Sequence, residues 1–189
     1  MEFYVRAKSI VAIRHAKPLS QCFEDAPLDA KHLRQVRQFR AHLLRLAQKG
    51  EIPQRFDIAY TSSLKRARQT AQILFPKTQF IIDAQINERK TADTIYRSYR
   101  AQLSIKDSAQ MYSFDYNGSA ESLQQLERRI KLWLLQNNGS WHNKNILIVA
   151  HKEVLRILQK VLENRDLDWL QRSYKSRIPY LYLYMFKNR

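Results

Sequence analysis

Two histidines stand directly after short apolar runs that predict buried strands. His15 follows Arg14 at the end of residues 10–14, and His151 follows residues 146–150. A neutral imidazole can act as a nucleophile or carry a proton near neutral pH, and the guanidinium of Arg14 is a fixed cation. This combination of residue types suits a site that binds an anion and attacks it.

A third predicted strand ends close to another arginine. Residues 57–61 precede the segment SSLKRARQTAQIL, in which Ser62 or Ser63 can cap a helix whose first turn carries Arg66. A helix N-terminus and an arginine both favour phosphate binding. Because ligands of an open α/β sheet bind beyond the carboxyl ends of its strands, we expect Arg66 to join the two histidines in one crevice.

Apolar runs alternate along the chain with stretches of helical periodicity, which predicts an α/β fold. Apolar residues recur at helical spacing within 33–46, 123–133 and 154–161, and each stripe is expected to face the sheet. Residues 79–82 and 181–186 complete the set of predicted strands. The runs that end at the two histidines are apolar without alternation, as in fully buried parallel strands. We therefore predict a three-layer α/β/α sandwich around a mostly parallel sheet, with residues 181–186 as an antiparallel edge.

The domain organisation follows from length and composition. The chain has 189 residues, 44% of them hydrophobic, which is enough for one sizeable core. No composition break or repeat marks a linker, so we predict a single domain over residues 1–189. The segment 91–117 has no sustained period but carries Arg97 and Arg100 among several tyrosines. We expect this segment to be an insertion that leaves the core and forms a lid.

Basic residues outnumber acidic ones, with 33 Lys plus Arg against 17 Asp plus Glu and a formal charge of +16. Such a surplus attracts anions, whether phosphorylated metabolites, nucleic acid, acidic proteins or a membrane surface. Cys22 is the only cysteine, so an internal disulfide is excluded and a reducing cytoplasm is the expected location. The apolar run near the N-terminus is too short for a secretion signal or a membrane span, so no membrane association is expected.

The composition also excludes several nucleotide and metal chemistries. The three glycines cannot form a GxGxxG turn or a GxxxxGK[ST] loop, and the sequence has no HExxH pair or cysteine cage. The triplet His151-Lys152-Glu153 matches half of a zinc deaminase signature, but the PCxxC half is absent. We therefore expect neither a metal nor a cofactor.

Four segments that contain these candidate residues follow one another along the chain: IVAIRHAKP, YTSSLKRARQTAQIL, INERK and ILIVAHKEVLRIL. In type and order they resemble the RHG, SSPLxRAxQTA, LxE and VxHG motifs of the histidine phosphatase superfamily, the phosphoglycerate mutase-like enzymes. EDAPLDAKHLRQV and NGSAESLQQLERRI are similar to two further segments of that family. Ala16 and Lys152 stand where the family has glycine, and Ser63 replaces its proline. None of these replacements removes a catalytic side chain.

The resemblance implies a phosphatase mechanism that passes through phosphohistidine. His15 is then the nucleophile that attacks phosphorus, and Arg14 and Arg66 hold the phosphoryl oxygens. His151 donates a further hydrogen bond to the phosphoryl group during its transfer. Glu88, in INERK, protonates the leaving oxygen and later accepts a proton from the attacking water. The mechanism needs no metal ion, because the fixed cations stabilise the developing charge.

Several alternatives stay open at this point. Acidic residues are common near loops, so Asp83 or Glu121 could replace Glu88 as the proton donor. A phosphatase is favoured over a phosphoglycerate mutase-type phosphotransferase, because mutases of the family are usually longer. A catalytically idle member that binds a phosphorylated ligand is a further alternative. A nucleic-acid binder is disfavoured, because the sequence has no RNP1 or GXXG motif.

The substrate class follows from the mechanism and the charge. We expect a phosphorylated small molecule or a phosphoprotein as the partner. Lys152, with Arg97 and Arg100 from the predicted lid, could favour a substrate that carries a second anionic group. The alternative is that these three side chains face water and only raise solubility.

Overall fold

The computed structural model describes residues 4–19, 25–89, 106–114 and 120–188. This part of the chain contains a five-stranded sheet with the strand order β3-β2-β4-β1-β5. The strands are β1 (Ser9–Arg14), β2 (Ile58–Ser62), β3 (Ile81–Asp83), β4 (Asn145–Ala150) and β5 (Leu183–Lys187). β1, β2, β3 and β4 pair in parallel, and β5 pairs with β1 in the antiparallel direction. The predicted mostly parallel sheet with an antiparallel edge is confirmed.

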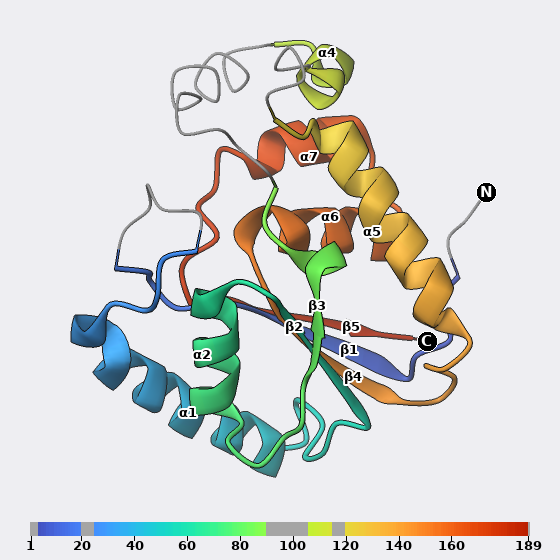
Figure 1. The fold of residues 1–189 in the computed structure, drawn as a ribbon. Helices are drawn as coiled ribbons and strands as arrows, with labels where there is room; N and C mark the ends of the chain where they lie inside the picture. The colour runs from blue at the N-terminus through green and yellow to red at the C-terminus, as the bar shows by residue number, and fades with distance from the viewer. Residues whose placement is uncertain (1–3, 20–24, 90–105, 115–119, 189) are drawn as a thin grey trace.

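Helices cover both faces of this sheet (Figure 1). The α-helices are α1 (Leu33–Gln48), α2 (Lys65–Leu74), α4 (Ser108–Ser113), α5 (Leu123–Asn138), α6 (Lys152–Leu162) and α7 (Leu167–Ser173). Two short 3-10 helices, η1 (Ala30–His32) and η2 (Ala84–Ile86), precede α1 and follow β3. The predicted helical stripes fall within α1, α5 and α6.

The alternation of side chains along β1 divides the core in two. Ile10 and Ala12 pack into one hydrophobic cluster with residues of α5 and α6, whereas Val11 and Ile13 pack into a second cluster with residues of α1 and α2. Successive side chains of a strand point to opposite faces, so a strand that is apolar at every position needs a helical layer on each side. The structure therefore has the predicted three layers.

Two of the predicted strands begin two residues later than expected. The chain before β3 has exposed side chains, and β3 itself is a short edge strand in which Ile81 and Ile82 are about half exposed. Leu181 has φ of +61°, a left-handed conformation that is costly for a branched residue and cannot continue a strand. The last strand therefore begins at Leu183 instead of residue 181.

Only part of the predicted lid lies among the described residues. Residues 108–113 form α4, which packs against α5 and α7 with Met111 buried. Arg97 and Arg100 fall outside the described residues, so the lid stays a prediction. None of the helices in the described ranges has the length and apolar character needed to cross a membrane.

Candidate functional site

The topology brings the carboxyl ends of β1 and β4 together. The two strands are in register from Ser9 opposite Asn145 to Arg14 opposite Ala150. The backbone N–H of His15 then donates to the carbonyl of Ala150 at 3.0 Å. As a result the rings of His15 and His151 lie side by side, with their centroids 4.9 Å apart. Both side chains are buried.

Arg66 reaches the same place from the next strand, as expected. α2 begins directly after β2, and Nε of Arg66 in its first turn lies 3.3 Å from Nε2 of His15. The expected serine cap is wrong, because the N-cap residue is Leu64 and its side chain makes no capping hydrogen bond. The hydroxyls of Ser62 and Ser63 bond instead to Asn87.

The hydrogen bonds of His15 define its tautomer. Nδ1 lies 2.6 Å from the carbonyl oxygen of Ala16, which can only accept, so Nδ1 carries the hydrogen. Nε2 is therefore the unprotonated nitrogen, and its lone pair accepts from Nε of Arg66. Burial, followed by the positive charges of Arg66 and Arg14, lowers the pKa of His15 to about 3 against the opposing hydrogen bond to Ala16. At neutral pH the ring is uncharged, which is the nucleophilic form.

Arg14 is positioned by the segment that precedes β5. Its Nη1 donates to the carbonyl of Ile178, and its guanidinium carbon lies 3.9 Å from the centre of the Tyr180 ring. The same ring lies 5.7 Å from the ring of His15. Nε of Arg14 is buried without a hydrogen-bond partner in the described part of the chain. Burial lowers the pKa of Arg14, with partial compensation from Tyr180 and Glu88.

His151 is held by Ser62 and carries no charge at neutral pH. Its Nε2 lies 2.7 Å from Oγ of Ser62, and its side chain is fully buried. Burial and the neighbouring His15, Arg66 and Arg14 hold the pKa of His151 well below its ordinary value. The two histidines are thus neutral rings among fixed cations.

Glu88 contacts the first turn of α6, the helix whose N-cap residue is His151. Its Oε1 accepts from the backbone N–H of Arg89 at 3.1 Å and from that of Glu153 at 3.3 Å. Burial raises the pKa of Glu88, and the negative charge of Glu153 adds to this, whereas Lys152 and other cations oppose it. A carboxyl with a raised pKa is suited to carry a proton.

The two alternative acids are engaged elsewhere. Asp83 caps η2 by accepting from the backbone N–H of Gln85 at 2.8 Å, and its other oxygen accepts from Nε1 of Trp133 at 2.8 Å. Glu121 forms an ion pair with Arg129 at 2.6 Å. Both carboxylates therefore anchor helices, whereas Glu88 contacts the backbone at the start of α6, whose N-cap residue is His151.

Lys152 contacts a buried acidic residue. Its Nζ lies 2.9 Å from Oε1 of Glu153. The same oxygen lies 3.5 Å from Nη1 of Arg156, and Oε2 of Glu153 accepts from the hydroxyl of Tyr174. Burial alone would raise the pKa of Glu153. The positive charges of Lys152, Arg156 and Arg89 outweigh this effect and lower the pKa to about 2. We expected Lys152 to face water or a second anionic group of the substrate. In the structure its ammonium group also contacts Glu153.

Two residues of the site were not singled out from the sequence. Tyr180 contacts Arg14 across 166 positions of the chain, and no local pattern signals such a contact. Asn87 lies inside the quoted segment INERK, next to Glu88. Its position beside a predicted catalytic acid was the signal that could have drawn attention to it.

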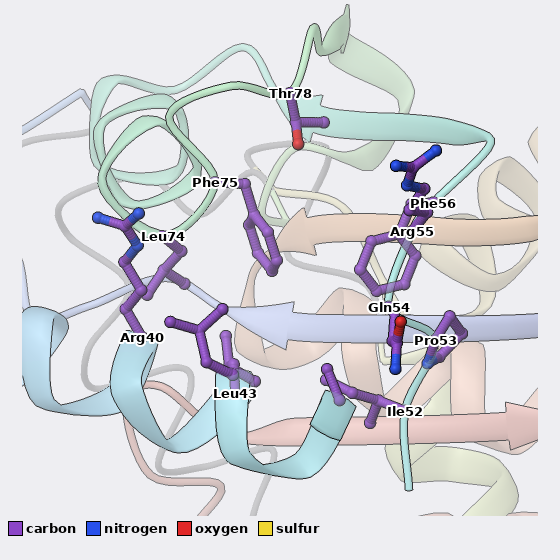
Figure 2. Close-up of a pocket in the computed structure, with 12 residues that line it drawn as sticks. Arg40, Leu43, Ile52, Pro53, Gln54, Arg55, Phe56, Leu74, Phe75 and Thr78 are labelled. Carbon is purple, nitrogen blue, oxygen red and sulfur yellow. The ribbon is translucent and has the colours of Figure 1, made fainter. Parts of the chain in front are cut away.

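A separate cavity of about 270 Å³ lies at the opposite end of the sheet (Figure 2). It is formed by the C-terminal end of α2, by α1 and by residues 52–56, which precede β2. Its lining is mostly apolar, with Leu43, Leu74 and Phe75 among its residues, and its charged members are Arg40 and Arg55. The lining has no histidine, cysteine or carboxylate, so the histidine pair marks the candidate site. Among the described residues, no group of three or more His, Cys, Asp and Glu could hold a metal ion.

Comparison with known proteins identifies relatives in sequence and in fold. The uncharacterized phosphatase PhoE of Bacillus subtilis (strain 168) is 28% identical over 144 residues, which cover 75% of this chain and 67% of that protein. The fold is similar to that of phosphoglycerate mutase from Bacillus anthracis, with a TM-score of 0.69, 16% identity and coverage of 96% of this chain and 88% of that one. It is also similar to phosphoserine phosphatase from Entamoeba histolytica in complex with 3-phosphoglyceric acid, with a TM-score of 0.70, 20% identity and coverage of 94% and 89%.

A protein family also matches most of the chain. The family model of the histidine phosphatase superfamily (branch 1) matches residues 10–176, a range that includes both histidines, Arg14, Arg66 and Glu88. The chain therefore belongs to the histidine phosphatase superfamily.

Proposed function

We propose that this protein is a phosphatase that hydrolyses phosphomonoesters through a phosphohistidine on His15, without a metal ion. The observation that carries the proposal is the geometry of His15: its Nδ1 is hydrogen-bonded to a carbonyl, and its Nε2 keeps a lone pair that faces Arg66. A neutral ring held in this way presents one defined nitrogen to an electrophile.

In the first step, Nε2 of His15 attacks phosphorus and the ester P–O bond breaks. The proton of the Glu88 carboxyl goes to the leaving oxygen, so the alcohol departs neutral. The raised pKa of Glu88 supports this assignment, because the acid must hold its proton until the bond breaks. The enzyme is left with a phosphoryl group on His15 and a carboxylate on Glu88.

In the second step, water attacks the phosphorus of the phosphohistidine and the P–N bond breaks. The Glu88 carboxylate takes a proton from that water, which restores the acid for the next cycle. Inorganic phosphate leaves, and Nε2 of His15 regains its lone pair.

The cations of the site stabilise the phosphoryl group in both steps. Arg66 already lies at hydrogen-bond distance from Nε2 of His15, where the phosphoryl group would be transferred. Arg14 is held nearby by Ile178 and Tyr180 and keeps a buried Nε for which no partner is present in the described residues. Fixed donors in a dry site are worth far more than the same donors in water.

The proposed substrate is a phosphorylated small molecule or a phosphoprotein. The structures that share this fold include a mutase and a phosphatase, so the fold alone does not select between hydrolysis and transfer. The relative with 28% identity is named a phosphatase, which favours hydrolysis. A phosphoglycerate mutase-type phosphotransferase is the second candidate, and a catalytically idle phospho-ligand binder is the third.

The test is hydrolysis of p-nitrophenyl phosphate by the purified protein, with and without EDTA. We expect turnover that EDTA does not reduce, inhibition by vanadate, and an acid-labile phosphoprotein after rapid quenching. His15→Ala should abolish all three signals, whereas the matched control His42→Ala, on the exposed face of α1, should keep them. Full activity in His15→Ala would refute the assignment. Acceptor-dependent phosphate transfer without release of inorganic phosphate would favour the mutase.

A further inference from the structure

The hydroxyl of Ser62 uses its full hydrogen-bonding capacity. Its Oγ lies 2.7 Å from Oδ1 of Asn87 and 2.7 Å from Nε2 of His151, and it accepts from the backbone N–H of Leu64 at 3.2 Å. A serine hydroxyl has one hydrogen to donate and two lone pairs that accept. Only one of the three neighbours can therefore receive the hydrogen.

Asn87 is the neighbour that receives it. The backbone N–H of Ser63 donates to Oδ1 of Asn87 at 2.9 Å, which fixes this atom as the carbonyl oxygen of the amide and not its nitrogen. A carbonyl oxygen can only accept, so its 2.7 Å contact with Ser62 requires the hydroxyl hydrogen. One lone pair of Ser62 is then used by Leu64, and the other must accept from the ring of His151.

We propose that Asn87 is a positioning residue, which acts through Ser62 to hold His151 in its Nε2–H tautomer. His15 has the opposite arrangement, because its Nδ1 donates to the carbonyl of Ala16. The two rings, 4.9 Å apart, therefore carry their hydrogens on different nitrogens. The tautomer of each ring is set by the partner of one nitrogen, which leaves the other nitrogen for chemistry.

The assignment has a consequence for phosphate binding, which rests on the proposed function. Nδ1 of His151 is buried and has no hydrogen-bond partner among the described residues. In the Nε2–H tautomer this nitrogen has a lone pair and cannot donate to a phosphoryl oxygen. His151 thus donates only after Nδ1 takes up a proton, and the incoming anion supplies the charge that favours this form. Without the anion, the ring is kept neutral by burial and by the charged and titratable groups around it, which are His15, Arg66, Arg14 and Arg129.

The direct test is the tautomer of His151 in the resting protein. Long-range ¹H–¹⁵N correlation spectra of labelled protein distinguish a protonated ring nitrogen from a bare one, and a His151→Gln variant assigns the signals. We expect a protonated Nε2 and a bare Nδ1 in the wild type. Asn87→Asp keeps an oxygen acceptor for Ser62 and should preserve this tautomer. Asn87→Leu has a similar size but no acceptor, so the Ser62 hydrogen can turn to His151 and the Nδ1–H form should gain population.

Two results would overturn the proposal: an Nδ1–H tautomer in the wild type, or identical tautomer populations in the wild type and Asn87→Leu. Asn87→Ala removes the same oxygen and replaces the leucine variant if circular dichroism shows that the latter is unfolded. This readout requires no catalysis, so an absence of phosphatase activity would refute the proposed function and leave the tautomer result standing.

A second measurement tests whether Nδ1 of His151 takes up a proton when phosphate binds. Titration calorimetry with inorganic phosphate, in buffers of different ionisation enthalpy, counts the protons taken up on binding. Uptake in the wild type and in Asn87→Asp should exceed that in Asn87→Leu by up to one proton. Equal uptake in all three proteins would contradict the assigned consequence.

Discussion

The carboxylate of Glu121 holds the guanidinium of Arg129 in a two-pronged ion pair, at 2.8 Å to Nε and 2.6 Å to Nη2. The third nitrogen of Arg129 donates to the carbonyl of Gln85 at 2.5 Å and to that of Asn87 at 3.2 Å. One arginine of α5 therefore fixes the backbone of the segment that carries Asn87 and Glu88.

Arg129→Met is expected to lower both stability and activity. It leaves two carbonyls and the Glu121 carboxylate without their donor, and we expect a loss of about 1–3 kcal/mol in the free energy of unfolding. Activity toward phosphomonoesters should fall because Glu88 is no longer fixed. Urea unfolding and steady-state kinetics measure the two effects. The neighbouring Arg128 is exposed, and Arg128→Met serves as the control that should change neither.

Glu88→Gln is expected to slow the departure of poor leaving groups selectively. An alkyl phosphate needs a proton on its leaving oxygen and should lose about 10²-fold or more in kcat/KM, whereas p-nitrophenyl phosphate should lose much less. Comparison of the two substrates isolates the acid function from a general loss of structure. Exposed Glu51→Gln is the matched control. Equal losses on both substrates would show that Glu88 is structural.

The buried neutral His15 should make the protein sensitive to acid. Its pKa is about 3 in the folded state against an ordinary value of 6.5, so below pH 6.5 the unfolded chain binds the extra proton. Stability therefore rises with pH across this window and is lost as the pH falls from 6.5 toward 3. The contribution is a slope of about 1.4 kcal/mol per pH unit for one proton. Urea unfolding between these limits should show a slope that His15→Gln reduces by about this amount; an unchanged slope would contradict the pKa assignment.

Lys152 is predicted to favour substrates with a second anionic group, despite its contact with Glu153. Lys152→Met should lower the ratio of kcat/KM for a bisphosphorylated substrate to that for its monophosphorylated analogue, and high salt should lower the wild-type ratio in the same direction. Lys131→Met removes a lysine that pairs with Glu127 on α5 and is the control. A ratio that Lys152→Met leaves unchanged at low salt would assign Lys152 to the internal ion pair alone.

The convergence of Arg14, His15, Arg66 and His151 was predictable from sequence because it follows from general rules of parallel sheets. Uninterrupted apolar runs identify buried strands, and parallel strands bring the residues that follow them to one edge. Those rules need only local patterns. Such rules predict which strand ends meet, whatever side chains distant elements supply to the site.

The choice of proton donor could not be made in the same way. Apart from the family resemblance of INERK, which favours Glu88, no local pattern separates Asp83, Glu88 and Glu121, because these acids differ in partners supplied by distant elements. Asp83 accepts a hydrogen bond from Trp133, and Glu121 accepts from Arg129; both partners lie on α5. Leu181 illustrates a second limit, because nothing local predicts a left-handed conformation at a leucine. The left-handed residue lies in the connection between Tyr180 and β5, which begins at Leu183.

The place of β1 between β4 and β5 has a consequence for synthesis of the chain. β1 is translated well before both strands that complete its hydrogen bonds, which lie at Asn145–Ala150 and Leu183–Lys187. The apolar run from Ile10 to Ile13 therefore lacks both of its strand partners while residues 15–144 are translated. Nascent chains that pause before Asn145 should be the ones most prone to bind chaperones or to associate through this strand.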